Sequence, residues 1–163
     1  MKLYIDLYGE EHERPAETPV QWRIGGYGVV EREGRLLMVE PVWTTGWTWD
    51  LPGGGVRLMP EETILEGIIR EVHEETGYRF APDPATLPHH GDVFFRTLTG
   101  RYLRSITFTV RGEVGDEPDP AWRRPEDEIA RVGWVDPRTL RREAVHWHHW
   151  DALVKLGYVK DDG

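Results

Sequence analysis

Several segments of the chain either alternate polar and apolar residues or contain a short apolar run, and both patterns predict β-strands. The turn-forming residues at 31–34 separate the first two segments and predict a hairpin, and Thr99-Gly100 separates a later pair in the same way. Residues 3–8 also alternate, which predicts a short edge strand in an N-terminal arm that continues as a polar loop to Gln21. The main strands are predicted at residues 22–30, 35–39, 92–98, 102–114 and 129–135.

Two helices are predicted between and after these strands. The first should cover residues 60–76, because Pro60 suits a first helical turn and Gly77 suits the position just after the last turn. The second should start at Asp136-Pro137 and continue to residue 156. The apolar stripe of the first helix, which we expect to be buried, consists of Leu65, Ile68, Ile69 and Val72.

The order of these elements predicts an α/β fold, a sandwich of helices around a mixed central sheet. Residues 51–55, Leu-Pro-Gly-Gly-Gly, are expected to break any regular element before the first helix. The chain has 163 residues, which suits one well-buried domain better than two. We therefore expect the arm at 1–21, followed by a single domain at 22–163.

Composition narrows the functional classes. The formal net charge of −9 argues against binding long nucleic acids or anionic membranes through bulk electrostatics. There is no cysteine, so disulfides, thiolate metal sites and cysteine nucleophiles are excluded. No apolar run approaches the roughly 18–20 residues of a membrane span, and no signal peptide is visible. These features are compatible with a cytoplasmic protein.

Three glutamates lie close together in the last two turns of the first predicted helix. Glu71, Glu74 and Glu75 fall within an arc of about 100° on a helix, where like charges cost roughly 0.2–0.5 kcal/mol per pair. They also face the unfavourable end of the helix dipole. Carboxylate and carbonyl oxygens are the ligands that Mg²⁺ and Mn²⁺ prefer, so the pattern predicts a bound divalent cation. Arg70 could pair with a glutamate and fix its rotamer.

The same stretch resembles the Nudix box of the Nudix hydrolase family, G-x5-E-x7-R-E-U-x-E-E-x-G-U, where U is a bulky apolar residue. Residues 62–78 satisfy the second part, with Tyr78 at the final apolar position. Seven residues instead of five separate Gly54 from Glu62, which predicts a two-residue insertion. The strand pair before the box and the strand at 129–135 also look like this family.

The resemblance implies a Nudix-like α/β/α sandwich and hydrolysis of a phosphoanhydride in a nucleoside diphosphate linked to another group. It implies Mg²⁺ or Mn²⁺ as cofactor and a small nucleotide as substrate. The implied metal ligands are Glu71, Glu74, Glu75 and the carbonyl near Gly54. The general base is either the box glutamate or a glutamate on a later loop, for which Glu128 is favoured. The expected catalytic residues are therefore Glu71, Glu74, Arg70 and Glu128.

The candidate substrate-binding residues are less specific. Aromatic side chains can stack on a nucleobase with about 1–3 kcal/mol, although core or lid packing explains the tryptophans as well. Residues 93–96 hold neither the proline nor the tyrosine that mark some Nudix subfamilies, so the substrate stays open. We expect His146, His148 and His149 to lie on a partly exposed helix face, with His148 pointing away from the other two. The substrate-binding candidates are Trp47, Trp49, Phe95 and Arg104.

Two alternatives to a hydrolase remain at this point: a Nudix domain that binds a nucleotide as a sensor, and another Nudix activity such as isomerisation. Members of the family without hydrolytic activity commonly lose box carboxylates, and all of them are present here. The family also includes many homodimers, in which residues 3–8 could serve as an exchanged edge strand.

Overall fold

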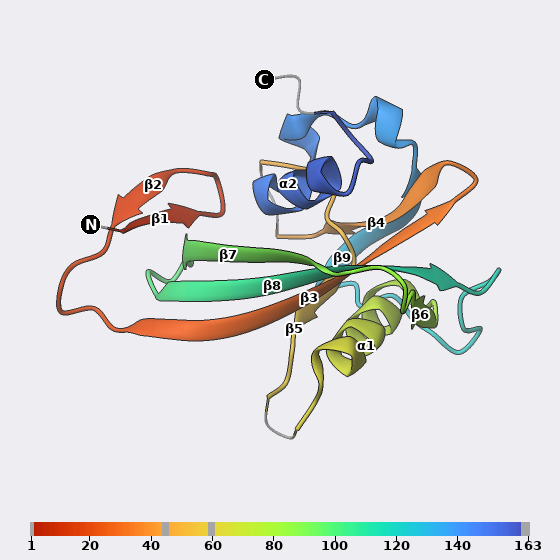
Figure 1. Ribbon diagram of the computed structural model, residues 1–163, viewed down its shortest axis with the longest axis horizontal. Helices are drawn as coiled ribbons and strands as arrows, with labels where there is room; N and C mark the ends of the chain where they lie inside the picture. Colours follow the sequence, from red (N-terminus) through yellow and green to blue (C-terminus); the bar gives the residue numbers. More distant parts are fainter. Residues whose placement is uncertain (1, 44–45, 59–60, 161–163) are drawn as a thin grey trace.

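The computed structural model describes residues 2–43, 46–58 and 61–160, and within these ranges one mixed sheet lies between two helices. Helix α1 (Ile64–Thr76) covers one face of the sheet and helix α2 (Trp147–Lys155) covers the other, as Figure 1 shows. This arrangement confirms the predicted α/β sandwich. No helix in the described ranges is long and apolar enough to cross a membrane.

Nine strands of the described chain form the sheet, in the order β2-β1-β7-β8-β3-β4-β9, with β5 paired to β3 and β6 to β8. The long pair β3–β8 is parallel, as is β1–β7, and the other pairs are antiparallel. The strands are β1 (Leu3–Asp6), β2 (Glu11–Glu13), β3 (Val20–Arg32), β4 (Arg35–Pro41), β5 (Gly53–Gly55), β6 (Phe80–Pro82), β7 (His89–Arg96), β8 (Tyr102–Val114) and β9 (Ile129–Val135).

The predicted hairpin between the first two main strands is confirmed. Strands β3 and β4 pair through Arg32 and Arg35, which leaves Glu33 and Gly34 as the two loop residues. Both loop residues have positive φ, 50° and 73°, as a two-residue hairpin turn of type I′ requires.

The expectation that residues 51–55 break regular structure is wrong for the glycines. Gly53–Gly55 form strand β5, antiparallel to Gly25–Tyr27 of β3. The two backbones approach so closely that a Cβ on Gly53 would lie 2.2 Å from the carbonyl oxygen of Gly26. Glycine therefore permits this pairing rather than preventing it.

Helix α1 begins later than predicted, at Ile64 instead of Pro60, which itself lies outside the described residues. Thr63 is the N-cap: its hydroxyl accepts a hydrogen bond from the backbone N–H of Glu66, whose side chain accepts one from the N–H of Thr63. This capping box sets the start of the helix. The predicted end is confirmed, because Gly77 has φ 76° and its N–H donates to the carbonyl of His73.

The predicted apolar stripe of α1 is only half buried. Ile68 and Val72 are fully buried, whereas Leu65 is 48% and Ile69 37% exposed. Ile68 and Val72 are one helical turn apart and face the sheet, whereas Leu65 and Ile69 lie further round the helix, so the sheet covers a narrower face than the sequence pattern indicates.

The N-terminal arm contains one strand more than expected. The predicted loop after residue 8 includes β2, which occupies the sheet edge, so that β1 lies inside the sheet between β2 and β7. Tyr4 of β1 is buried, with its ring 5.4 Å from that of Phe94 and 4.9 Å from that of Tyr102. The arm is thus packed against the rest of the domain.

The predicted second helix over 136–156 is wrong in its first half. Two short 3-10 turns, Pro137–Thr139 and Arg142–Ala144, precede α2, and Val145 between them and α2 is extended. The carbonyl of Ala144 accepts hydrogen bonds from the backbone N–H groups of Thr48 and Trp49. Long-range pairing with the loop before β5 therefore replaces helical hydrogen bonds in this segment.

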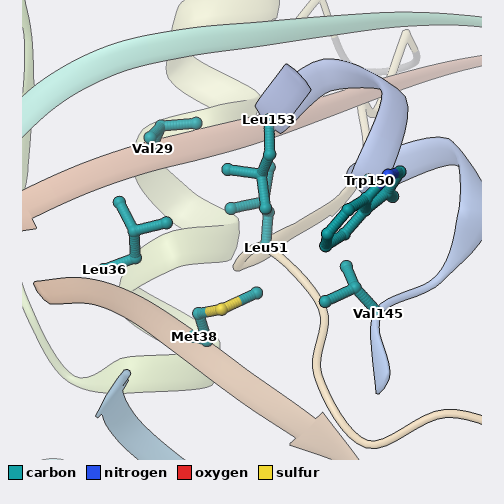
Figure 2. Packing of buried hydrophobic residues seen from close by; sticks show 7 residues of the cluster. All are labelled: Val29, Leu36, Met38, Leu51, Val145, Trp150 and Leu153. Carbon is teal, nitrogen blue, oxygen red and sulfur yellow. The ribbon is translucent and has the colours of Figure 1, made fainter. Parts of the chain in front are cut away.

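The two faces of the sheet carry separate apolar cores, because successive strand residues point to opposite faces. On β3, Val29 packs beneath α2 and Val30 beneath α1. On β4, Leu36 and Met38 likewise face α2 while Leu37 faces α1. Figure 2 shows the core beneath α2, formed by Val29, Leu36, Met38, Leu51, Val145, Trp150 and Leu153.

Candidate functional site

A pocket of about 560 Å³ opens beside β5 and receives side chains from both helices. This volume lies within the range of about 300–1,000 Å³ typical of small-molecule sites. Its lining is mostly apolar, with a small number of ionisable groups. These groups and the glycines beside them are Arg23, Asp50, Gly53, Gly54, Glu75, Arg101, Glu128, His146, His148 and His149.

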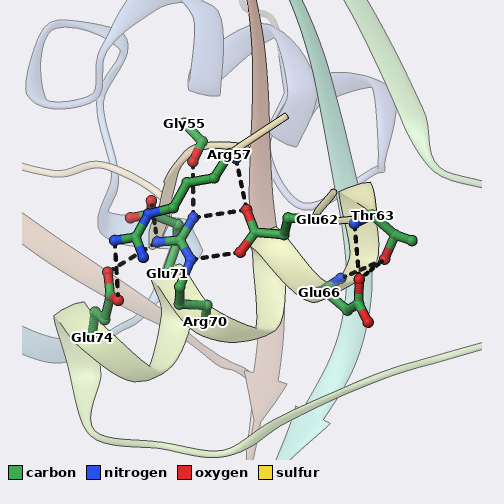
Figure 3. Close-up of polar contacts among 8 residues, drawn as sticks. All are labelled: Gly55, Arg57, Glu62, Thr63, Glu66, Arg70, Glu71 and Glu74. Carbon is green, nitrogen blue, oxygen red and sulfur yellow. Dashed lines mark hydrogen bonds and ion pairs between the residues drawn. The ribbon is translucent and has the colours of Figure 1, made fainter. Parts of the chain in front are cut away.

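Arg70 organises the polar cluster at the end of α1. Its Nε and Nη2 donate to the two carboxylate oxygens of Glu62 at 2.6 and 3.0 Å. Its Nη1 donates to Glu71 Oε1 at 2.7 Å and to Glu74 Oε2 at 3.0 Å. Its Nη2 also donates to the carbonyl of Gly55 at 3.0 Å, and Figure 3 shows all of these contacts. The predicted pairing of Arg70 with box glutamates is present, and the rigid guanidinium fork holds three carboxylates and β5 in one arrangement.

Glu62 belongs to this cluster although it precedes the helix. The hydrogen bonds from Arg70, followed by one from the backbone N–H of Arg57, lower its pKa to about 2. The backbone N–H of Glu62 in turn donates to the carbonyl of Arg57 at 3.2 Å, which closes a loop between the two residues. The expected insertion between Gly54 and Glu62 falls partly on residues 59 and 60, outside the described residues.

Glu71 and Glu75 face the glycines of β5. A Cβ on Gly54 would lie 2.5 Å from Glu71 Oε2, so only glycine leaves room for the carboxylate there. Glu75 Oε2 accepts a hydrogen bond from the backbone N–H of Gly53 at 2.9 Å. Burial raises the pKa of Glu71, and burial together with the neighbouring Glu71 charge raises the pKa of Glu75 to about 8. Both carboxylates are therefore deprived of solvent beside a backbone that can supply further oxygen atoms.

Glu74 differs from the other two box glutamates in its surroundings. Its side chain is 47% exposed and forms ion pairs with Arg70 at 3.0 Å and with Arg57 at 3.5 Å. Glu75 lines the pocket directly, whereas Glu74 lies on the outer side of the cluster. The helix thus offers two partly buried carboxylates and one exposed carboxylate, and the metal-binding role of each remains a prediction.

The structure also brings Glu128 to the pocket. It lies on the loop before β9, and its N–H donates to the carbonyl of Pro125 at 3.0 Å. Its carbonyl accepts a hydrogen bond from the N–H of Val42, which ties the two loops together. The negative charge of Glu128 contributes to the raised pKa of Glu75. A residue 53 positions after Glu75 thereby reaches the same pocket.

Only one of the four substrate-binding candidates, Phe95, lies in the pocket lining. Trp49 instead packs under the guanidinium of Arg131, whose Cζ lies 4.5 Å from the ring centroid. Arg104 is paired with Asp92 at 2.6 Å on the outer side of the β7–β8 pair. Trp47 packs against the ring of His146, with 4.5 Å between centroids. The structure therefore does not bring Trp47, Trp49 or Arg104 to the pocket surface.

Several pocket residues were not predicted from the sequence. Arg23 and Tyr27 lie four positions apart on β3 and so share one face of the strand. Asp50 is only 8% exposed, and burial raises its pKa to about 7. Its position between Trp49 and Leu51 is a signal, because an acidic residue is rarely buried among apolar residues unless it is paired. Nothing local in the sequence pointed to Arg23 or Tyr27.

The expectation of a partly exposed face holds for His146 and His148, but it is wrong for His149, and it is wrong that His148 points away from the other two. His149 is only 4% exposed, and one nitrogen from each of His146, His148 and His149 lies within 4.8 Å of the others. Burial lowers the pKa of His146 to about 3 and that of His148 to about 4. The reason is that α2 starts at Trp147, so His146 precedes the helix and turns towards the first helical residues.

Comparisons with known proteins agree with this architecture. The model of the NUDIX domain family matches residues 20–156. A MutT-like protein from Streptomyces ambofaciens is 34% identical over 123 residues, which cover 75% of this chain and 69% of the relative. A MutT NUDIX hydrolase structure from Burkholderia pseudomallei has a TM-score of 0.62 at 26% identity, covering 82% of this chain and 96% of that one. A NUDIX hydrolase structure from Nitrosomonas europaea has a TM-score of 0.58 at 26% identity, covering 76% and 78%.

The chain belongs to the NUDIX family. This result confirms the resemblance carried by the box between Gly54 and Tyr78, and it confirms the expected class of enzyme, a Nudix pyrophosphohydrolase. The family match begins at residue 20, so the N-terminal arm that contains β1 and β2 lies before the matched region.

Proposed function

We propose that the protein hydrolyses a phosphoanhydride bond in a nucleoside diphosphate linked to another group, and that the reaction depends on Mg²⁺ or Mn²⁺. The observation that carries the proposal is the pair of largely buried carboxylates, Glu71 and Glu75, beside the glycines of β5 and next to the pocket. Burying like charges together is unfavourable unless a cation compensates them.

The residues present fit a hard divalent cation. The set of oxygen donors consists of the carboxylates of Glu71, Glu74 and Glu75 and the carbonyl of Gly54, which suits Mg²⁺ or Mn²⁺. The missing side chain at Gly54 leaves space for Glu71 in this arrangement. When bound, the cation would neutralise diphosphate charge and activate water for attack.

The protein's own side chains position the carboxylates and supply the general base. Arg70 holds Glu62, Glu71 and Glu74 in fixed rotamers, which prepares the site before substrate enters. Glu128 is the favoured general base, because it is exposed in the pocket lining and close enough to affect the pKa of Glu75. Glu71 is the alternative base, and it already contacts both Arg70 and the Gly54 position.

The pocket supports a small nucleotide as substrate. Phe95, Trp43 and Trp147 line it and can stack on a base, which is worth about 1–3 kcal/mol. Arg23 and Arg101 add two guanidinium groups for phosphate oxygens. The apolar and cationic groups of the lining thus match the two chemical halves of a nucleotide.

A substrate screen tests the proposal. Nucleoside diphosphate derivatives are incubated with the protein and Mg²⁺ or Mn²⁺, and the products are separated by ion exchange. We expect cleavage of at least one compound into two phosphate-containing products, and no cleavage with chelator. Binding of a nucleotide without cleavage in the presence of either metal would instead indicate a sensor. Substituting Glu128→Gln and Glu71→Gln in turn distinguishes the two candidate bases, since loss of the base removes the acidic limb of the pH–rate profile.

A further inference from the structure

Three histidines converge at the start of α2, where they line the same pocket as Glu75. They come from one short segment, with His146 as the N-cap of the helix and His148 and His149 in its first turn. The ring centroids of His148 and His149 are 4.6 Å apart, and that of His146 lies 6.1 and 5.7 Å from them. No step of the proposed hydrolysis uses these residues.

The spacing of the imidazole nitrogens suits a shared ligand. One nitrogen from each ring lies within 4.8 Å of the other two. A tetrahedral metal ion with nitrogen ligands at about 2.0–2.1 Å needs these atoms about 3.4 Å apart. Each ring nitrogen would therefore move by about 1 Å or less, which side-chain rotation at the helix start can provide.

Three of the ring nitrogens are buried and lack a hydrogen-bond partner among the described residues. Both ring nitrogens of His146 and Nδ1 of His149 are shielded from solvent and have no hydrogen-bond partner in the described part of the chain. His149 as a whole is only 4% exposed. A buried polar atom without a partner costs about 1–3 kcal/mol, so a cluster of them calls for a ligand. Burial keeps these imidazoles neutral, which is the form that binds metal ions.

Groups around the cluster can orient the rings as metal sites require. His148 Nε2 lies 2.9 Å from the hydroxyl oxygen of Thr107 on β8. His149 Nε2 lies 3.9 Å from Asp50 Oδ1. A histidine that binds metal through one nitrogen usually uses the other for such a hydroxyl, carbonyl or carboxylate.

From this geometry we propose that His146, His148 and His149 form a second metal site, which takes a first-row transition-metal ion of the Zn²⁺ class. Imidazole nitrogens favour Zn²⁺, Co²⁺, Ni²⁺ and Cu²⁺, whereas the oxygen ligands at the end of α1 favour Mg²⁺ and Mn²⁺. The two sites would therefore select different ions within one pocket. An ion bound by the three histidines would hold the start of α2 in place and put a positive charge in the lining, next to Asp50.

Metal binding can be measured without any substrate, so the test does not depend on the proposed hydrolysis. The full chain, prepared without a polyhistidine tag, is titrated with Co²⁺ in excess Mg²⁺, and the visible d–d absorption is recorded. Nitrogen-ligated, four-coordinate Co²⁺ absorbs far more strongly than six-coordinate Co²⁺ with oxygen ligands, and the chain has no cysteine that could add thiolate bands. We expect an intense band that saturates at one equivalent and is displaced by Zn²⁺.

Matched variants assign the band to the cluster. His146→Gln and His148→Gln should each weaken Co²⁺ binding by about 10²-fold or more, since even loss of an outer partner of a ligand costs about 10–100-fold. His90→Gln, on the exposed side of β7, should bind as the wild type does. Glu71→Gln should keep the band, because it alters only the site at the end of α1.

Thermal unfolding provides a second readout. Zn²⁺ should raise the melting temperature of the wild type and of His90→Gln above the value in Mg²⁺ alone, and should not do so for His146→Gln or His148→Gln. Melting in chelator shows that each variant is folded, and if one of the two is not, the other carries the comparison. The proposal is overturned if the wild type shows no intense band, or if the band persists in a folded His146→Gln or His148→Gln variant. In that case the three rings only pack against each other and against Tyr27.

Discussion

The end of α1 and the start of α2 both contribute ionisable side chains to one pocket, but they do so by opposite means. At the end of α1 the groups are carboxylates and a guanidinium, and Arg70 binds three carboxylates through four hydrogen bonds and the carbonyl of Gly55 through a fifth. At the start of α2 the groups are imidazoles that burial keeps neutral, with several ring nitrogens unpartnered. The first arrangement fits a hard cation and its phosphate ligand, and the second fits a softer metal ion.

The difference shows how burial and charge pairing decide which kind of metal ion a group of side chains can bind. Glu71 and Glu74 pair with Arg70, so the cost of crowding their negative charges is partly compensated before any ligand binds. For the histidines, Asp50 Oδ1 lies 3.9 Å from His149 Nε2, and burial, followed by the charges of the neighbouring imidazoles and of Arg23, lowers the pKa of His149. Four predictions test this contrast, from the largest effect to the smallest.

Removing a carboxylate at the end of α1 should have the largest effect. Glu71→Gln keeps the shape of the side chain but removes a proposed metal ligand, and the lost electrostatic stabilisation of several kcal/mol corresponds to about 10²–10³-fold in kcat. Steady-state kinetics with Mn²⁺ on the substrate found in the screen measures this. Glu66→Gln is the matched control on the same helix, because glutamine also serves at that position of a capping box. Similar activities of the two variants would argue against a catalytic site on α1.

Filling the space beside Glu71 should have the next largest effect. In Gly54→Ala the new Cβ would lie 2.5 Å from Glu71 Oε2, so the carboxylate or β5 must shift. A displacement of about 1 Å at a reacting site can cost about 10²-fold in rate, and kcat should fall by that order. Gly115→Ala, whose Cβ would meet no atom nearer than 4.0 Å, should have normal kinetics. An unchanged kcat in Gly54→Ala would mean that Glu71 has room to move without loss of function.

The raised pKa of Glu75 predicts a pH dependence of stability in chelator. Burial raises this pKa from an ordinary value near 4.5 to about 8, so the folded protein keeps the proton that the unfolded chain releases. The contribution of Glu75 to stability is therefore present below about pH 4.5 and is lost as the pH rises to about 8, by roughly 4 kcal/mol. Urea unfolding at pH 5 and pH 8 should show this loss in the wild type relative to Glu75→Gln.

The exposed Glu113 on β8 supplies the control for this measurement, since Glu113→Gln should keep the pH profile of the wild type. Mn²⁺ should stabilise the wild type more at pH 8 than at pH 6, because its ligands bind in the deprotonated form. If Glu75→Gln and the wild type show parallel profiles in chelator, the carboxyl of Glu75 is not deprived of solvent as the structure indicates.

The smallest effect concerns the aromatic lining. Phe95→Ala should raise KM about 5–100-fold with little change in kcat, because it removes a stacking surface worth about 1–3 kcal/mol. Arg104→Ala should change KM less than about twofold, since Arg104 forms an exposed ion pair outside the pocket. A larger effect of Arg104 than of Phe95 would place the substrate on the outer side of the β7–β8 pair.

Most strands were predictable because each carries its own alternating pattern and turn residues. The strand Ile129–Val135 has the predicted bounds, and the hairpin at Glu33-Gly34 forms as its residues indicate. The errors have tertiary causes. The pairing of Gly53–Gly55 with β3 and the hydrogen bonds to Ala144 come from segments far away in the sequence, and no local propensity records them.

By itself the sequence determined the family and the carboxylate cluster, because a helix phase of 100° per residue places Glu71, Glu74 and Glu75 on one arc wherever the helix packs. Only the tertiary structure decided which of them are buried, that Glu128 joins them, and that Trp49 and Arg104 do not. It also brought the histidines at the start of α2 together with Asp50 and Thr107. The physical reason is that burial, and with it pKa and ligand preference, depends on chain segments that meet only in the folded protein.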